Sequence, residues 1–367
     1  MAIDVIYFID CPLDANGLPV KPECMLTSKV QPKFSAPRLQ ALQTHLKGRP
    51  LFRIHLSQRA IFGHEFVRDP NQSRQQNIRA YTDHQITHRN LPMVPQGVFP
   101  LVRFLAKLDH FLPAGFTGFP LTEINIASEN SYGSGERFEA SLDHYGIPVN
   151  SSSFTEGDSP IERVNVRKGD VFFSGSQFSY DEDEKRVPAL RVLPVLADPH
   201  AEYDQYAIVW DWDATIAHQG SEAIFQSGGV AAFEDHELRH RRNPMRPGPV
   251  AALFGSALIL RALFDESKQT APFINMLLTA RSDAAGRRVR ATLPLWTQNA
   301  PFPLAIDDYN AVTGGHKGDY MRALVNGAFA TNGRRLHPIL LDDSSPNANK
   351  AADAGFPAAV VPTSARE

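Results

Sequence analysis

Residues 206–217 read YAIVWDWDATIA, an apolar run of β type that breaks into a polar turn carrying Asp211 and Asp213. In open α/β sheets, side chains that follow the carboxyl end of a parallel strand enter the crevice where ligands bind. Carboxylates at positions i and i+2 of a tight turn can approach one reaction centre from different directions. Acidic turns of this kind are common, so the pattern gains its weight from its place after a strand and from the elements farther along the chain.

Three further elements come after this strand in chain order. The run LLTARS ends with Thr279, whose hydroxyl can hold a phosphate oxygen, and GGHKG supplies Lys317 in a glycine-rich setting. Such a lysine is suited to neutralising phosphoryl oxygens during transfer. The run ILLDDS ends with Asp342 and Asp343, the hard oxygen ligands that Mg²⁺ requires. The order predicts four strand ends that present Asp, Thr, Lys and a pair of Asp to one site.

The chain also repeats itself. Residues 80–95 read AYTDHQITHRNLPMVP and residues 232–247 read AFEDHELRHRRNPMRP, with eight of sixteen positions identical at an offset of 152. The flanking β-type runs also correspond by position in the sequence. The run at 51–62 matches that at 206–217, the run at 122–131 matches that at 274–283, and the run at 169–177 matches that at 337–345. We interpret this as an internal duplication, which decides the architecture.

Both copies alternate short β-type runs with helical stretches such as FPLVRFLAKLDHF and VAALFGSALILRALF. This is the pattern of a parallel sheet with crossover helices. We therefore predict an α/β protein of two tandem, doubly wound, Rossmann-like domains with parallel sheets. The predicted division is an N-terminal extension at 1–46, a first domain at 47–195 and a second at 196–367, with a small helical cap at about 216–247.

The ordered Asp, Thr, Lys and Asp-Asp elements resemble the motif set of the haloacid dehalogenase-like (HAD) superfamily. The tandem layout, the LLTARS and GG-x-KG elements and the DHE segment are further similar to the cytosolic 5′-nucleotidase I family, from about residue 48 to 362. Members of that family hydrolyse nucleoside monophosphates, AMP prominently. The resemblance implies a Mg²⁺-dependent phosphomonoesterase with two HAD-type domains, acting through an aspartyl-phosphate on a nucleoside 5′-monophosphate.

Carried over by position, the resemblance implies Asp211 as the nucleophile, Asp213 as the acid and base, and Lys317 as the third catalytic group. The predicted metal ligands are Asp211, Asp342 and Asp343, with Asp213 contributing its backbone carbonyl. The predicted substrate-binding residues are Trp212, Thr279, Ala280, Arg281 and Gly315.

Two departures from the family pattern bear on function. The residue between the two aspartates is typically glycine, and here it is Trp212, which stacks on a base or narrows the pocket, or else packs against a helix or cap. The first copy lacks the carboxylates, because it has Ser57, Arg59, Ser174 and Gly175 where the second has Asp211, Asp213, Asp342 and Asp343. We expect the first copy to be structural or to shape the substrate site.

The repeated histidines, at 84 and 88 and again at 236 and 240, have the i, i+4 spacing of some zinc sites. A zinc site would need a third ligand. The pairs also occur in the copy without catalytic residues, which favours a structural role.

Composition sets the broad class. Hydrophobic residues make up 43% of the chain and charged residues 21%, so there are enough apolar side chains to fill two cores. The net charge of −3 gives no basic surface that would attract a nucleic acid polymer or an anionic membrane. Cys11 and Cys24 cannot form a disulfide framework, no apolar run has the length of a membrane span, and the N-terminus lacks signal-peptide features. We expect a cytoplasmic protein with a small-molecule nucleotide as its partner, and a homo-oligomer remains open.

Two rival hypotheses stay open at this stage. The same chemistry could act on another small phosphate ester, such as a sugar phosphate. A protein of another class could bind nucleotides on this fold without turnover. The intact Asp211, Asp213, Lys317 and Asp342 favour an enzyme.

Overall fold

The computed structural model describes residues 34–363, except positions 64, 68, 168, 179–185, 202, 267–271, 280, 282, 302, 305, 312–315 and 334. Both cysteines and two of the predicted substrate-binding residues, Ala280 and Gly315, lie outside the described residues.

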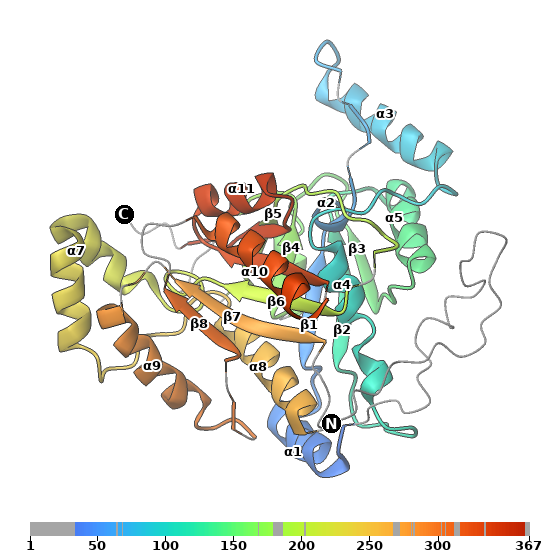
Figure 1. The fold of residues 1–367 in the computed structure, drawn as a ribbon. Helices are drawn as coiled ribbons and strands as arrows, with labels where there is room; N and C mark the ends of the chain where they lie inside the picture. The colour runs from blue at the N-terminus through green and yellow to red at the C-terminus, as the bar shows by residue number, and fades with distance from the viewer. Residues whose placement is uncertain are drawn as a thin grey trace.

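The described strands form one ten-stranded sheet, in the order β3-β2-β1-β4-β5-β10-β9-β6-β7-β8 (Figure 1). The strands of the first half are β1 (Phe52–Leu56), β2 (Thr122–Ser128), β3 (Ser151–Phe154), β4 (Val171–Ser174) and β5 (Ala189–Val192). Those of the second half are β6 (Gln205–Trp210), β7 (Phe273–Thr279), β8 (Asp308–Ala311), β9 (Leu336–Asp342) and β10 (Ala358–Val360). The apolar runs identified in the sequence thus form strands, as predicted.

The two halves of the sheet have the same strand order. From the outer edge inward, each half runs third, second, first, fourth and fifth strand, and all pairs within a half are parallel. The halves join through β5 and β10, which pair antiparallel with Ala359 opposite Val192. The predicted α/β class and parallel sheet are confirmed, and both halves contribute to one continuous sheet. The division into domains at 47–195 and 196–367 stays a prediction.

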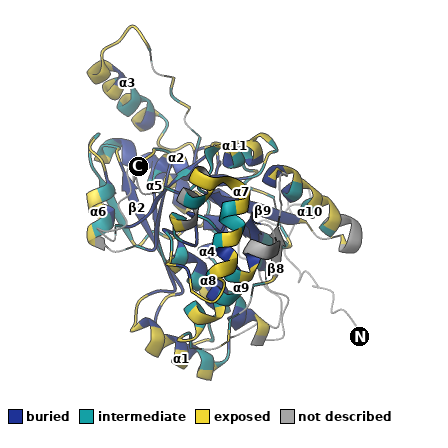
Figure 2. Cartoon of the chain, turned by 90° about the vertical axis from the view of Figure 1, so that its left-hand side faces the viewer, coloured by how far each residue is buried: buried dark blue, intermediate teal, exposed yellow. Residues whose placement is uncertain are grey.

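Helices cover both faces of the sheet because side chains alternate along each strand. Ile208 and Trp210 of β6 enter the largest core, whereas Ala207 and Val209 enter a second core on the opposite face. The helices packed on the largest core are α1 (Ala36–Leu46), α4 (Phe99–Leu105), α5 (Tyr132–His144), α8 (Ala251–Glu266) and α9 (Asp283–Thr297). The opposite face is covered by α6 (Ile161–Arg167), α10 (Lys317–Asn332) and α11 (Ser345–Asp353). Figure 2 shows the buried strands between helices with exposed outer faces.

Two helices, one in each half, lie outside these layers. They are α3 (Arg74–Thr87) and α7 (Glu222–Arg239), which carry the repeated sequence and project from the sheet in Figure 1. In α7, Gly229 has non-helical angles, with φ of 69°, a region that favours glycine, so two helical segments join there. Among the described residues, the remaining short helices are α2 (Gln58–Ile61) and two 3₁₀ turns, Leu108–Phe111 and Gln219–Ser221.

The repeated residues make the same contacts in both halves. The second histidine of each pair follows its helix, contacts the backbone oxygen of the first at 2.8 Å through Nδ1, and lies 4.2 Å from it, ring centre to ring centre. The repeated methionines anchor the segment that follows, because Met93 N donates to Ser141 Oγ and Met245 N donates to Thr292 Oγ1. The repeated sequence therefore makes equivalent contacts where each projecting helix meets the body, and a structural role for the histidines stays a prediction.

Candidate active site

The site is built at the carboxyl ends of two neighbouring strands. Strands β6 and β9 pair in parallel with Trp210 opposite Leu341, so Asp211, which follows β6, lies next to Asp342 at the end of β9. Oxygen atoms of Asp211, Asp342 and Asp343 all lie within 4.8 Å of one another. Within the described part of the chain, no other group of three acidic, histidine or cysteine ligands comes together, and neither histidine pair belongs to one.

Lys317 connects the two strand ends. Its ammonium donates to Asp211 Oδ1 at 2.5 Å and to Asp342 Oδ2 at 2.7 Å, and its side chain is 4% exposed. The sequence led us to expect this lysine at a strand end. Instead it is the first residue of α10, separated from the end of β8 at Ala311. The helix start brings the long side chain back over the sheet edge to reach both carboxylates.

Asp342 is held in place from several sides. It is fully buried, and its Oδ1 accepts a hydrogen bond from the backbone N–H of Ser344 at 2.8 Å. The side-chain amide of Asn347, on α11, lies 3.4 Å from both carboxylate oxygens. The carboxylate therefore has a fixed orientation toward Lys317 and Asp211.

Burial and crowding shape the charges of this site. Burial, with Asp342 and the other carboxylates, raises the pKa of Asp211 well above its usual range, although Lys317 opposes the shift. Burial and Asp342 likewise raise the pKa of Asp343 to about 6. Burial disfavours the charge on Lys317, but Asp211 and Asp342 outweigh it and raise the pKa of the ammonium. One lysine thus faces more negative charge than it can neutralise, which is the electrostatic setting of a cation site.

Asp213 is joined to the second strand of this half. Arg281 Nε donates to Asp213 Oδ2 at 2.7 Å, and a second guanidinium nitrogen of Arg281 donates to Asp213 Oδ1. The backbone N–H of Arg281 donates to Thr279 Oγ1 at 3.2 Å, and Thr279 is fully buried at the end of β7. Arg281 was predicted to bind substrate, and the structure has its guanidinium engaged with carboxylates, so that role stays a prediction.

Two residues of this network, Glu237 and Arg288, were not identified from sequence. Glu237, on α7, accepts a hydrogen bond from Arg281 and another from Arg288 Nη1, the latter at 2.8 Å, and its side chain is fully buried. The signal available in the sequence was an acidic residue at 237, where the first copy has Gln85 at the matching position.

Trp212 packs inside the protein. Its side chain is fully buried, its ring lies 5.5 Å from that of Trp296 on α9 in a stacked arrangement, and its indole N–H points at Met245 Sδ, 3.2 Å away. Of the two alternatives that the sequence left open, the structure has the packing one. The predicted contact of Trp212 with substrate finds no exposed ring surface here and stays a prediction.

The matching region of the first half has different chemistry. Ser57 Oγ accepts a hydrogen bond from Gly175 N at 3.1 Å, which ties together the ends of β1 and β4. From α3, Tyr81 directs its hydroxyl at Gln58 Oε1, 3.0 Å away, and at Asn130 Oδ1, 3.2 Å away. At these positions neutral polar groups therefore bond to one another, and the carboxylates of the second half have no counterpart among them.

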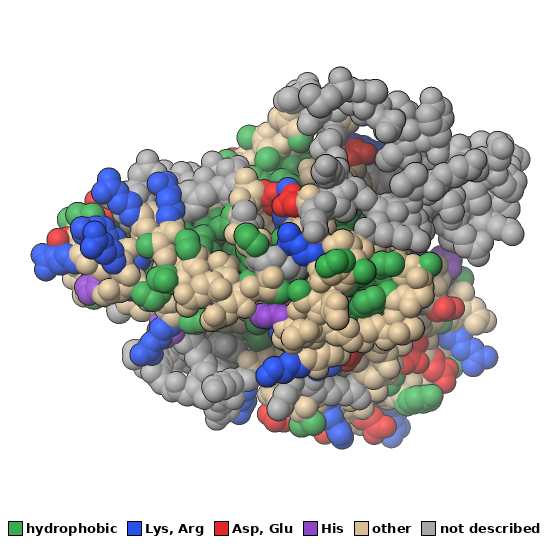
Figure 3. Space-filling model, turned by 90° about the horizontal axis from the view of Figure 1, so that it is seen from below, with side chains coloured by type: hydrophobic (Ala, Val, Ile, Leu, Met, Phe, Trp, Pro, Cys, Tyr) green, Lys and Arg blue, Asp and Glu red, His purple; other side chains and the backbone are tan. Residues whose placement is uncertain are grey.

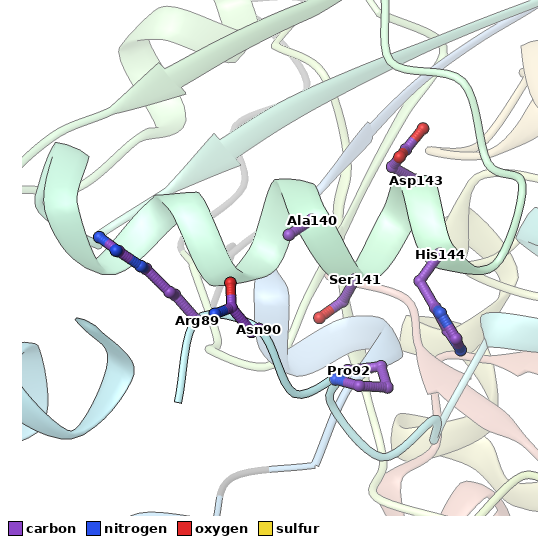
Figure 4. A pocket seen from close by; sticks show the side chains of 7 residues that line it. All are labelled: Arg89, Asn90, Pro92, Ala140, Ser141, Asp143 and His144. Carbon is purple, nitrogen blue, oxygen red and sulfur yellow. The ribbon is translucent and has the colours of Figure 1, made fainter. Parts of the chain in front are cut away.

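A separate pocket of about 290 Å³ lies in the first half, between α5 and the segment after α3 (Figure 4). It is lined by Arg89, Asn90, Pro92, Ala140, Ser141, Asp143 and His144. Its serine is already bonded to Met93 N and to the Arg137 carbonyl, so this pocket presents no activated nucleophile.

The family model of the 5′-nucleotidases matches residues 45–365, almost the whole described chain. The chain belongs to the 5′-nucleotidase family. Among curated relatives of this chain, human cytosolic 5′-nucleotidase 1B is 24% identical over 230 residues, covering 60% of this chain. The match spans 37% of the length of that relative.

Two solved structures show weaker likenesses to this chain. The UTR4 protein of Saccharomyces cerevisiae covers 43% of the chain, and 90% of its own chain, at 15% identity and a TM-score of 0.21. A HAD-like family hydrolase of Porphyromonas gingivalis covers 45%, and 94% of its own chain, at 14% identity and a TM-score of 0.23. TM-scores this low do not assign a fold. Across the described residues, no helix has both the length and the apolar character needed to cross a bilayer.

Proposed function

We propose that this protein is a HAD-type, magnesium-dependent phosphomonoesterase that hydrolyses nucleoside 5′-monophosphates through an aspartyl-phosphate on Asp211. The observation that carries the proposal is the convergence of Asp211, Asp342, Asp343 and Lys317 at one sheet edge. The family assignment supports a nucleotide as the substrate. The name of the human relative supports a cytoplasmic location.

The donor set fits Mg²⁺. Three carboxylates within 4.8 Å supply hard oxygen ligands, and burial, together with the neighbouring carboxylates, raises the pKa of Asp211 and of Asp343. Asp211, Asp342 and Asp343 would hold the ion, with the backbone carbonyl of Asp213 as a further ligand. When bound, the ion would offset the repulsion between an anionic nucleophile and an anionic ester.

The protein residues then have separate tasks. An oxygen of Asp211 attacks phosphorus, and the bond between phosphorus and the ribose oxygen breaks. Asp213 donates its proton to that leaving oxygen, and later accepts a proton from the water that hydrolyses the aspartyl-phosphate. Lys317 and Thr279 stabilise the phosphoryl oxygens by position and charge.

The two halves are proposed to differ in role. The equal strand order of the halves supports a duplicated pair of HAD-type domains, at 47–195 and 196–367. The first has hydroxyl, amide and arginine side chains where the second has its catalytic carboxylates, so its role is structural or substrate-shaping. In the second, the segment 216–247 with α7 is the cap that closes over substrate.

The cap also carries charge that suits an anionic substrate. Figure 3 shows basic side chains gathered at the end of the molecule where α7 lies. The exposed arginines of the cap segment are Arg239, Arg241, Arg242 and Arg246. A positive patch beside the site raises the local concentration of a phosphate ester and speeds its arrival.

The test is phosphate release from a panel of nucleoside monophosphates and sugar phosphates, each with Mg²⁺ and with excess chelator. The proposal expects Mg²⁺-dependent release, fastest with a nucleoside 5′-monophosphate. Faster release from a sugar phosphate would show that the substrate assignment is wrong, while the proposed reaction chemistry would stand. No release from any ester would leave only a binding protein.

A further inference from the structure

Glu237 is a buried carboxylate that α7 directs into the body of the protein. Its side chain is fully buried, and two guanidinium groups, from Arg281 and Arg288, bind its two oxygens. A buried carboxylate destabilises a fold unless it is paired and hydrogen-bonded. Both partners are buried or nearly so, with 2% and 12% of their side chains exposed. Burying three charged groups destabilises the fold more than packing a helix on the body requires, which indicates that they serve a further purpose.

The same guanidinium that binds Glu237 also binds the catalytic turn. Arg281 donates hydrogen bonds to both oxygens of Asp213. The ring centre of Phe233, also on α7, lies 5.0 Å from the guanidinium carbon of Arg281. A planar guanidinium bound to both oxygens of a carboxylate fixes the plane of that carboxylate. An unbroken line of contacts therefore runs from the cap helix, through Glu237 and Arg281, to Asp213.

The first half shows which part of this network seats the helix. Arg137 occupies the place of Arg288, and each donates through Nε to the chain after its projecting helix, to Leu91 O at 2.9 Å and Asn243 O at 3.0 Å. Arg137 also reaches Gln85, the residue matching Glu237, at 3.4 Å. The charge of Arg137 is met by Glu65, at 2.9 Å, so a neutral amide at position 85 is compatible with a seated helix where the arginine has another carboxylate partner.

The contacts between Arg281 and Asp213 have no counterpart in the first half. Asn130 stands in the place of Arg281, and Arg59 in the place of Asp213. The acidic residue on the projecting helix therefore occurs in the half that has the aspartate to be oriented, and an amide replaces it in the half that has none. Glu237 and Asp213 thus occur together in the same half, which indicates a role for Glu237 in the reaction.

We propose that Glu237 is a positioning residue, which acts through Arg281 to hold the Asp213 carboxylate in the orientation for proton transfer and links that orientation to the seating of the cap helix. The inference rests on the proposed function, since it assigns Asp213 the role of acid and base. Glu237 and Asp213 both bind the guanidinium of Arg281, which joins them.

The test compares Glu237→Gln with Asp235→Asn in the full-length protein with Mg²⁺. Asp235 is a matched control, because it lies on the same helix, is 55% exposed and pairs with Arg239 at 2.6 Å. Glu237→Gln should lower kcat on a nucleoside 5′-monophosphate at least about tenfold with KM changed less than about threefold. Asp235→Asn should leave both within about twofold. Circular dichroism should show both variants folded.

Two readouts separate positioning from a merely structural role. With an aryl phosphate, whose leaving group needs no proton, Glu237→Gln should keep the rate of the first burst of aryl alcohol but lose steady-state turnover. In the background of Asp213→Asn, Glu237→Gln should cause less than about a twofold further loss, because the residue through which it acts has gone.

Each outcome decides the matter. If wild-type protein releases no phosphate, or Asp211→Asn is as active as wild type, the proposed function fails and this inference falls with it. If wild type is active and Asp211→Asn is not, the inference alone is overturned when Glu237→Gln matches Asp235→Asn. It is also overturned when Glu237→Gln lowers the burst rate as much as turnover, or when its loss persists in full beside Asp213→Asn.

Discussion

Replacing Asp211 by Asn tests the assignment of chemistry to the second half. The amide keeps the size of the side chain and removes the nucleophile, and removal of a covalent catalyst costs roughly three orders of magnitude in rate or more. The ammonium of Lys317 keeps its bond to Asp342 at 2.7 Å, so the neighbouring carboxylate stays paired. The expected result is a folded protein with turnover at least about a thousandfold below that of the wild type.

The same substitution should not destabilise the protein. Burial and the adjacent carboxylates raise the pKa of Asp211, which means that its ionised form is disfavoured in the folded state without metal. A neutral amide relieves this repulsion. In excess chelator, the thermal midpoint of Asp211→Asn should therefore equal or exceed that of the wild type, which separates lost chemistry from lost folding.

Ser57→Ala is the matched change in the first half. It removes the acceptor of the Gly175 N–H, a bond of 3.1 Å in a half-buried setting, and such a loss costs about 0.5–1.5 kcal/mol of stability. Turnover should stay within about twofold of wild type, because no step of the reaction uses this residue.

The assay is steady-state phosphate release with Mg²⁺, paired with circular dichroism and a thermal melt of each variant. Near wild-type turnover in Asp211→Asn would refute the nucleophile. Abolished turnover in a folded Ser57→Ala protein would place essential chemistry in the first half and refute the division of roles.

The same geometry predicts three further outcomes. Lys317→Ala should lower kcat by about a hundredfold or more with a smaller change in KM, since its charge acts mainly as the phosphoryl group transfers, and steady-state kinetics showing only weaker binding would contradict this. Excess chelator should abolish activity, and added Mg²⁺ should restore it. Mg²⁺ should also raise the thermal midpoint, because an ion that binds only the folded protein stabilises it. Full activity in excess chelator would show that the reaction does not need the metal. Burial lowers the pKa of His337 to about 4, from 6.5, and its Nε2 has no hydrogen-bond partner in the structure. The unfolded chain therefore binds the extra proton first, so stability is fully present above pH 6.5 and falls by roughly 3 kcal/mol as the pH drops through 4. Urea unfolding at several pH values should show this loss in the wild type and not in His337→Phe, and equal pH dependence in both would rule it out.

Much of the fold could be predicted from local pattern. The apolar runs at 206–217, 274–283 and 337–345 form β6, β7 and β9, because a strand buried on both faces is recognisable without its neighbours. The meeting of Asp211 and Asp342 could also be predicted, since parallel strands bring their carboxyl ends to one edge. The repeat predicted equivalent structures, and the equal strand order of the halves agrees with it.

Other features depended on contacts between distant segments. Lys317 reaches the carboxylates from the start of α10, a placement that the glycine-rich sequence around it did not reveal. The antiparallel pairing of β5 with β10 joins the two halves into one sheet, and short strands carry no signal for their partner. Trp212 had two open interpretations, and its burial against Trp296 chose between them.

The sequence by itself determined the order of strands and helices, the internal sequence repeat and the residues at the sheet edge where Asp211 and Asp342 meet, because periodicity and strand ends are local properties. Only the tertiary structure decided which charges meet. Glu237 and Asp213 are 24 positions apart in the sequence, and Arg281 lies between them in space although it follows both in the chain. Pairing of buried charges is settled by packing, where each ion must find a partner or destabilise the fold, and no local pattern records which partner that is.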